Sequence, residues 1–203
     1  TVQAAELPHT HYLCAGKDAD GNDVCTGVGG HQDVMTEFNQ VLRMNGNGLW
    51  VDNTPCATEG NDYLLPTGNY RLDESIDLGD KGIQISGNVN LCLNGHNIST
   101  DAGTVIYVCK KSEGVGSTFT LTDCHTGDAQ GHIQHNAGTT GRGLFVGTQR
   151  HLFDNTFTDT FNMYGGIISG NDSRTSGATF DTGGGLCVVA VGKFNMYGGS
   201  ITG

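Results

Sequence analysis

The sequence predicts an all-β fold: a right-handed parallel β-helix (solenoid) with a small irregular N-terminal cap that contains one helix. Three observations lead to this prediction. Glycine supplies 33 of the 203 residues, against a usual share of about 7%, and this much glycine disfavours helices. From about residue 67 onward, short apolar runs alternate with Gly, Asn, Asp, Ser and Thr, which is typical of strands and turns. Finally, a segment of ten residues occurs twice, and such repeats are the mark of stacked coils.

The repeated segment predicts which side chains are buried. FNMYGGIISG at residues 161–170 returns as FNMYGGSITG at residues 194–203, and each copy follows a related segment, GRGLFV or GGGLCV. Strands this short cannot bury a face alone, but stacked coils can, with like residues about 4.8 Å apart. The positions that stay apolar in both copies are expected to point inward: Phe161, Met163, Ile168, Phe194, Met196 and Ile201. An antiparallel β-sandwich is the alternative, but it does not predict repeated segments.

The composition changes near residue 66. All three prolines and the single tryptophan lie in residues 1–66, which are expected to form the N-terminal cap, with its Cys/His-rich loop, over the bare strand edges of the first coil. Residues 67–203 are expected to form the parallel β-helix coils. Because a repeat copy runs up to Gly203, the exposed coil edge there predicts further coils or an oligomer.

One helix is predicted within the cap. Residues 33–44 place their apolar side chains on one helical face, with Asp33 as an N-cap and Asn45-Gly46 as a stop. Strand alternation through Val34 and Phe38 fits nearly as well. The helix is therefore an expectation with a strand as its alternative.

The charge of the chain limits its partners. Ten Lys and Arg residues against 21 Asp and Glu residues give a formal net charge of -11, so a nucleic acid would be repelled. The sequence contains no apolar run of about 18 residues, so we expect no membrane span in this chain. The partners that we expect are glycans or surface proteins.

Cysteine and histidine residues near the start of the chain suggest a metal site. The candidate ligands are His9, His11, Cys14, Cys25 and His31. Imidazole and thiolate are the ligands that zinc prefers, and a structural zinc ion would staple a cap that has little core. A disulfide between Cys14 and Cys25 is the alternative. The acidic residues 18–23 resemble part of a calcium loop, but glycines stand where two ligands are needed, so calcium is less favoured.

The chain has seven cysteines in all, and the sequence does not choose a pairing among them. Cys92 and Cys124 fall in neighbouring predicted coils, where they are close enough for a bridge. Cys187 falls beside the predicted inward face, where it can serve in packing alone.

An enzyme is the less favoured interpretation. A polysaccharide lyase or glycoside hydrolase acting on acidic glycans needs carboxylates and a cation close together. The candidates stand where one coil departs from its neighbours: Asp123, Arg142, Asp154 and Asp159. The paired Asp, Gly-His-Gly and Arg-x-Lys segments that mark β-helix polygalacturonases are missing.

A binding role requires fewer special residues. Tyr164 and Tyr197 occupy equivalent outward positions, with Asn162 and Asn195 two residues away on the same face. Flat rings beside amide groups suit the faces and hydroxyls of sugars. The alternative is that the tyrosines only support each other across neighbouring coils.

The repeat segments resemble a known family, the glycine-rich β-helix repeat proteins found on the surface of Gram-positive, gut-type bacteria. The resemblance rests on GGGLCV followed by FNMYGGSITG, on HTHYLC near the start, and on LCLNGH at the first full coil. It implies a secreted or cell-surface module with a structural or adhesive role that presents a repetitive face to glycans or proteins. The long stretch between GRGLFV and residue 161 departs from the family's pattern.

Overall fold

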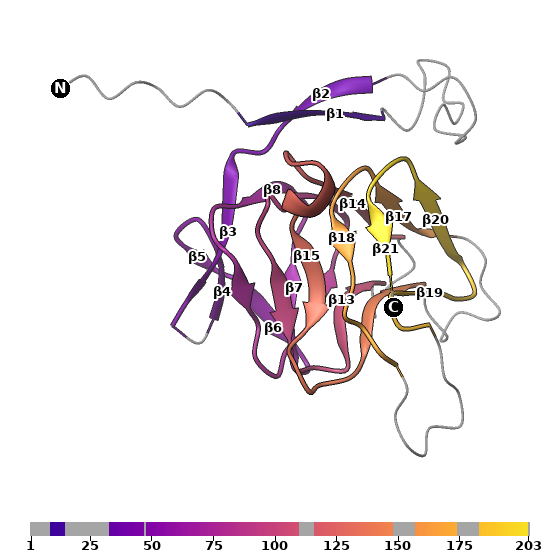
Figure 1. The fold of residues 1–203 in the computed structure, drawn as a ribbon. Helices are drawn as coiled ribbons and strands as arrows, with labels where there is room; N and C mark the ends of the chain where they lie inside the picture. The colour runs from indigo at the N-terminus through magenta and orange to yellow at the C-terminus, as the bar shows by residue number, and fades with distance from the viewer. Residues whose placement is uncertain are drawn as a thin grey trace.

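The computed structural model describes residues 9–14, 33–46, 48–109, 116–147, 157–173 and 183–202 (Figure 1). Within these residues the secondary structure is strand, apart from one short 3-10 helix, Gly127–Ala129, and no helix among them is long and apolar enough to cross a membrane. The strands are β1 Thr10–Cys14, β2 Asp33–Glu37, β3 Gln40–Asn45, β4 Gly48–Val51, β5 Thr54–Pro55, β6 Ala57–Glu59, β7 Asp62–Leu65, β8 Gly68–Leu72, β9 Ile76–Asp77, β10 Ile83–Ile85, β11 Asn88–Cys92, β12 Ile98–Thr100, β13 Thr104–Val108, β14 Thr118–Thr122, β15 His132–His135, β16 Arg142–Val146, β17 Asp159–Met163, β18 Ile167–Ile168, β19 Leu186–Val188, β20 Gly192–Met196 and β21 Ser200–Ile201.

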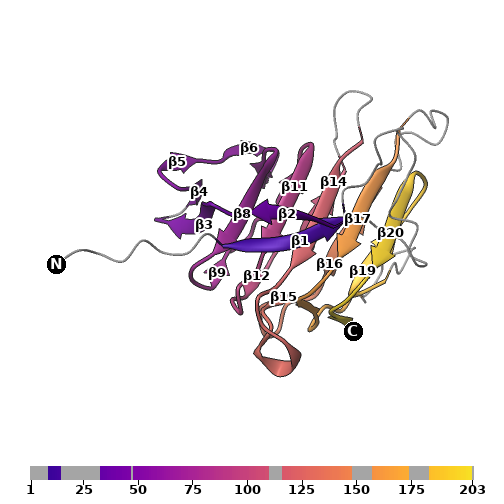
Figure 2. The ribbon, with the colours of Figure 1, turned by 90° about the horizontal axis from the view of Figure 1, so that it is seen from above.

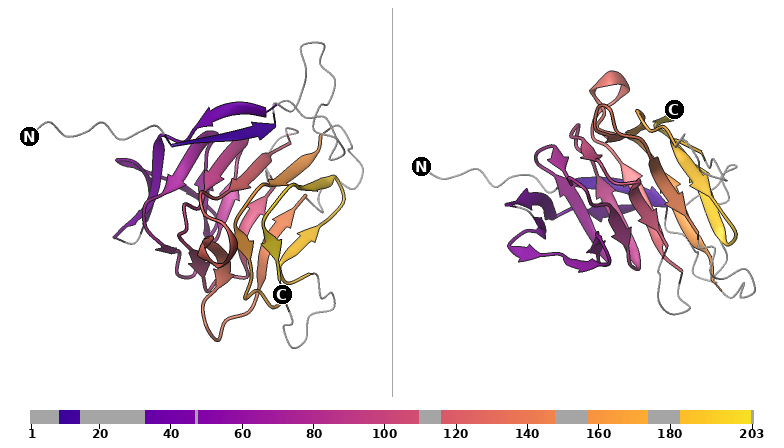
Figure 3. Two further views of the ribbon diagram at one scale, coloured as in Figure 1. Left: turned by 45° about the horizontal axis from the view of Figure 1, so that its top comes forward. Right: turned by 90° about the horizontal axis from the view of Figure 1, so that it is seen from below.

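These strands form four sheets. β1 and β2 make a separate antiparallel hairpin. The others form a six-stranded sheet in the order β19-β16-β13-β10-β7-β6, an eight-stranded sheet in the order β20-β17-β14-β11-β8-β3-β4-β5, and a five-stranded sheet in the order β21-β18-β15-β12-β9. From β7 onward the chain enters these three sheets in turn, so from β10 onward each strand pairs in parallel with the strand three places before it. Figures 2 and 3 show the paired strands side by side from other directions.

The predicted fold class, a right-handed parallel β-helix with an irregular cap, is corrected by this topology. The strands form separate open sheets, and none of the sheets closes on itself in the described part of the chain. The eight-stranded sheet is mixed, because β3, β4 and β5 pair antiparallel, and β6 pairs antiparallel with β7. The physical reason lies in the turns: Gly46, Asp52 and Gly60 have φ of 63°, 52° and 63°, and these left-handed residues reverse the chain between neighbouring strands.

The predicted helix over residues 33–44 is wrong. This segment forms β2 and β3, so the strand alternative gives the correct type of element. β3 pairs with both β4 and β8, and Phe38 and Leu42 are fully buried. Burial of these two side chains and sheet pairing on both edges of β3 outweigh the helical spacing, since tertiary contacts override local preference.

The repeat copies lie in register and form the core. Phe161 pairs with Phe119 on one side and Phe194 on the other, and its ring stacks on theirs at centroid distances of 5.5 and 5.2 Å. Phe161, Met163 and Ile168 are fully buried, as predicted. Their second copies are only half-buried or exposed, because β20 and β21 are the last strands of their sheets. The sequence therefore predicts the inward positions correctly, and position within the sheet sets how deeply each is buried.

The second glycine of each Gly-Gly pair turns the chain. Gly166 and Gly199 have φ of 87° and 79°, a region that glycine adopts at no steric cost. A Cβ atom on Gly166 would lie 2.9 Å from Leu93 Cδ1. This corner therefore needs glycine both for its backbone conformation and for space.

The aromatic stack leads to a test of the core. Phe161→Ala should lower the free energy of unfolding by about 3–5 kcal/mol, because it leaves a cavity between two rings that cannot close over it. Phe194→Ala removes the same side chain from a half-buried position and should cost roughly half as much. Urea unfolding followed by circular dichroism measures both. Equal losses of stability for the two variants would contradict the deeper burial of Phe161 between two rings.

Candidate metal centre

The hairpin of β1 and β2 lies across one side of the eight-stranded sheet (Figures 1 and 2). Leu13 and Phe38 are buried against Cys92 of β11, and Tyr164 packs against the same cluster. Alternation along β1 directs Leu13 toward the sheet and leaves Tyr12 66% exposed. Because His11 precedes Leu13 by two residues, its side chain also faces the sheet.

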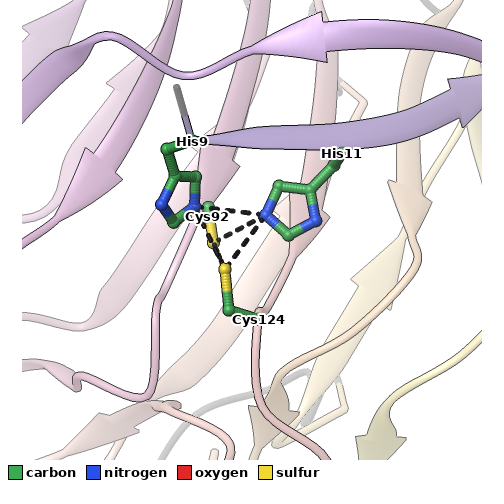
Figure 4. A group of neighbouring side chains, drawn as sticks. All are labelled: His9, His11, Cys92 and Cys124. Atoms are coloured by element: carbon green, nitrogen blue, oxygen red, sulfur yellow. Dashed lines mark hydrogen bonds between the residues drawn. The ribbon is translucent and has the colours of Figure 1, made fainter. Parts of the chain in front are cut away.

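Four metal-ligating side chains meet where this hairpin contacts the sheet (Figure 4). His9 and His11 come from the hairpin side, Cys92 ends β11, and Cys124 follows β14. Their ligand atoms all lie within 4.8 Å of one another. His11 Nε2 lies 3.2 Å from His9 Nε2, 3.1 Å from Cys92 Sγ and 3.4 Å from Cys124 Sγ. Cys124 Sγ lies 3.2 Å from His9 Nε2 and 3.7 Å from Cys92 Sγ.

Neighbouring side chains hold the two imidazoles. His11 Nδ1 lies 3.4 Å from the hydroxyl oxygen of Thr122, which leaves Nε2 facing the sulfur atoms. The Phe38 ring contacts both imidazoles edge-on, at centroid distances of 6.0 Å to His9 and 5.0 Å to His11. A hydrogen bond from Nδ1 of a histidine to an oxygen orients Nε2 for a metal, as is usual around zinc ligands.

Asp123 holds the turn that carries Cys124. Its side chain is fully buried, and its carboxylate accepts hydrogen bonds from the backbone N–H groups of Gly95, His125 and Gly131 at 3.1, 2.8 and 2.7 Å. These bonds join the turn after β11 to the turn after β14. Asp123 therefore acts as a positioning residue for the exposed Cys124.

The pKa shifts of all four groups favour their neutral forms. Burial lowers the pKa of His9, with Arg71 adding to the effect, and lowers the pKa of His11, with His9 adding to the effect. Burial also raises the pKa of the Cys92 and Cys124 thiols, and the nearby Asp123 carboxylate contributes to both shifts. Neutral imidazoles are ready to bind a metal, whereas thiols must first lose a proton, which a divalent cation drives directly.

The structure brings together only part of the predicted metal site. His9 and His11 belong to the cluster, which can hold a metal ion. Cys14 ends β1, but its side chain is not among those described, and Cys25, His31 and the acidic residues 18–23 lie outside the described residues. The predicted Cys14–Cys25 disulfide is therefore also outside them.

The metal ligands predicted from the sequence do not include Cys92 and Cys124, although both cysteines are predicted to lie in neighbouring coils, close enough for a bridge. Cys92 pairs in register with Thr122, so Cys124 follows two residues later at the same end of the sheet. Their sulfur atoms do not form a disulfide, because they lie 3.7 Å apart. Two cysteines at the same end of one sheet could have indicated a metal site. The position of the hairpin over these cysteines could not be predicted from the sequence.

Two of the candidate catalytic residues, Asp123 and Asp159, lie far apart. Thr160 pairs with Thr118, so Asp159 in β17 stands opposite Ser117. Asp123 lies six residues further along the chain from Ser117, which corresponds to about 20 Å along the strand direction. Paired carboxylates of glycosidases lie about 5–9.5 Å apart. The Asp159 carboxylate accepts a hydrogen bond from the Ser117 backbone at 2.8 Å, the Arg142 guanidinium lies over the Phe145 ring at 5.9 Å, and Asp154 lies outside the described residues.

The candidate glycan-binding residues do lie together, in β17, β20 and the turns after them. The Tyr164 and Tyr197 rings stack at a centroid distance of 4.6 Å, and Asn195 Nδ2 donates to Asn162 Oδ1 at 2.8 Å. All four side chains are half-buried. Each pair therefore forms a ladder between neighbouring strands and keeps part of its surface open to solvent.

The role of Asp123 leads to a stability test. Asp123→Asn removes the charge and turns an NH2 group toward backbone N–H donors, so it should lower the free energy of unfolding by about 2 kcal/mol. Asp128→Asn is the matched control, since Asp128 is exposed in the 3-10 helix nearby and should change stability by less than about 0.5 kcal/mol. Thermal and urea unfolding measure both variants. If Asp123→Asn leaves the free energy of unfolding unchanged, the carboxylate does not hold the turn.

Comparison of the chain with protein-family models, with curated proteins and with solved structures found no match. The resemblance of the repeats to bacterial surface proteins therefore receives no support from these comparisons. What the chain can do must be argued from the geometry of its own residues.

Proposed function

We propose that His9, His11, Cys92 and Cys124 bind one structural zinc ion. Zinc bonds of about 2.3 Å to sulfur and about 2.0–2.1 Å to nitrogen define a tetrahedron whose edges are about 3.8 Å between sulfurs, about 3.3 Å between nitrogens and about 3.5 Å between sulfur and nitrogen. Five of the six corresponding distances here are 3.7 Å between the sulfurs, 3.2 Å between the nitrogens and 3.1–3.4 Å between sulfur and nitrogen, and the sixth, between His9 and Cys92, is within 4.8 Å. This agreement between edges is the observation that carries the proposal.

The ligand set favours zinc in a closed, structural site. Two sulfur and two nitrogen ligands in a tetrahedron are typical of zinc. Because four protein ligands fill the coordination sphere, no position remains for a substrate or a reactive water. Calcium is disfavoured because it takes oxygen ligands.

The ion would fasten the hairpin to the eight-stranded sheet. His11 is 81 residues from Cys92, and His9 is 115 residues from Cys124. Apart from the metal ligands, the contacts are few: Leu13 and Phe38 pack on the sheet, and Arg71 Nη1 donates to the Phe38 carbonyl oxygen at 3.0 Å. A metal that joins segments so distant in sequence contributes its binding free energy directly to folding of the hairpin.

Zinc content provides the test. The purified chain should hold one zinc ion per molecule, measured by mass spectrometry of the metal, and Cys92→Ser or His11→Ala should reduce this to less than a tenth, because a tetrahedral site loses a ligand. Cys56→Ser and His132→Ala are matched controls, since both residues lie outside the four-residue cluster. Zinc content that does not respond to Cys92→Ser and His11→Ala would refute this assignment.

A chelator separates the structural role from incidental binding. Removal of zinc should speed hydrogen exchange in β1 and β2, because the hairpin then opens locally. Exchange in β11 should stay slow, since its pairing with β8 and β14 does not involve the ion. Unchanged exchange in the hairpin would mean that the ion binds without fastening it.

We further propose that the chain works as a secreted or cell-surface binding module for a glycan, with a structural or adhesive role. The support is the paired ladder of Tyr164 and Tyr197 and of Asn162 and Asn195, which are stacked or hydrogen-bonded yet half open to solvent. A net charge of -11 favours a neutral glycan over a uronic one, because like charges repel.

A panel of neutral and uronic glycans tests this role. Tyr197→Ala should weaken binding of a neutral glycan about 3–10-fold, because it removes one aromatic contact with the sugar. Met196→Ala changes the neighbouring residue, which alternation directs to the opposite face of the strand, and should leave binding unchanged. If no glycan of the panel binds, the chain is not a glycan-binding module. Release of cleaved products would favour the alternative function, a polysaccharide lyase or glycoside hydrolase.

A further inference from the structure

The two sulfur ligands of the proposed zinc site differ sharply in accessibility. Cys124 is exposed, whereas Cys92 is buried directly beside it with 3.7 Å between the sulfur atoms. Among the cysteines whose side chains are described, Cys56 is half-buried, and Cys109 and Cys187 are buried. An oxidant from solvent therefore meets Cys124 first, and Cys92 is the neighbouring thiol.

We propose that Cys124 and Cys92 form a peroxide-sensitive pair, in which Cys124 is oxidised first and Cys92 resolves it as a disulfide. This inference rests on the proposed zinc site, because the bound cation keeps both sulfurs as thiolates, the form that reacts with peroxides. A solvent-accessible thiolate beside a second cysteine is the usual arrangement of oxidation-sensitive sites. The geometry here supplies both parts.

The chemistry balances with hydrogen peroxide as the only oxidant. The Cys124 thiolate attacks one peroxide oxygen, which breaks the O–O bond, forms a sulfenic acid and releases hydroxide. The Cys92 thiolate then attacks the Cys124 sulfur, forms the S–S bond and displaces a second hydroxide. Two protons convert the hydroxides into two water molecules, so two thiolates lose two electrons to one peroxide and the zinc ion leaves with its charge unchanged.

The positions of the two cysteines allow this bond to form. A disulfide needs its sulfur atoms about 2.05 Å apart, so the present separation must shorten. Cys92 is fixed in β11 by its register with Thr122. Cys124 lies on a bend beyond β14, outside the strand ladder, and its exposed side chain can rotate toward Cys92 without moving the turn that Asp123 holds.

Oxidation would uncouple the hairpin from the sheet. The disulfide joins β11 to the turn after β14, which already belong to one sheet. His9 and His11 alone retain little affinity for zinc, since two of four ligands are gone. The hairpin would then depend on the packing of Leu13 and Phe38, and the response to peroxide would be its partial release.

The experiment uses the full chain loaded with zinc and titrated with hydrogen peroxide. A zinc-binding dye should report release of one zinc ion for each two thiols lost. Mass spectrometry of a digest should find the peptides of Cys92 and Cys124 joined with the loss of two hydrogens. Dithiothreitol followed by zinc should restore both the metal content and the slow hydrogen exchange of β1 and β2.

Two outcomes separate this inference from the zinc assignment itself. No zinc in the chain before peroxide would overturn both, whereas zinc that stays bound in peroxide, or is released without a Cys92–Cys124 bond, would overturn this inference alone. Cys56→Ser should behave as the unchanged chain does. The disulfide is mapped in the unsubstituted protein, so the result does not depend on whether a Cys92 or Cys124 variant folds.

Discussion

Four metal-ligating atoms meet at one place between the hairpin and the eight-stranded sheet, and the position of the hairpin depends on what makes that contact favourable. Two thiols and two imidazoles at separations of 3.1–3.7 Å offer one another little attraction beyond weak hydrogen bonds. A divalent cation among them converts the same geometry into four coordinate bonds. Two thiolates and two neutral imidazoles would also cancel the charge of the proposed Zn²⁺, so the half-buried centre would carry no net charge and would avoid the cost of burying one.

The parallel register of the sheets places the sulfur ligands. Cys92 and Thr122 stand opposite each other in β11 and β14. The end of β11 therefore supplies the Cys92 sulfur, and the end of β14 supplies the Thr122 hydroxyl near His11 and leads into Cys124. Further along the same sheet, the stacked rings of Phe119, Phe161 and Phe194 hold neighbouring strands in that register. A shift of one residue in any pairing would turn these inward rings to the other face. The core thus sets the geometry of the metal centre as well as the stability of the fold.

The sequence predicts what is local or repeated and misses what is distant. The repeated segment identified the inward positions Phe161, Met163 and Ile168, because two copies compared side by side separate constrained positions from variable ones. It could not show that turns at Gly46 and Asp52 add antiparallel strands, which make the largest sheet mixed. His9 and His11 could be named as ligands from their residue type and spacing. Their partners could not, because only the folded chain brings residues 81 to 115 positions away into contact.

The proposed metal would do for this fold what a disulfide cannot. A bond between Cys92 and Cys124 would link strands that are already paired in one sheet, and it would leave the hairpin with its small apolar contact and its hydrogen bonds to Arg71 and Thr122. The hairpin contributes histidines to the centre and the sheet contributes cysteines, so a tetrahedral ion joins the two, whereas a disulfide joins the sheet to itself. Because the hairpin supplies the histidines and the sheet supplies the cysteines, the arrangement favours a metal over a disulfide. For the same reason, oxidation of the two cysteines would separate the elements that the proposed ion would hold together.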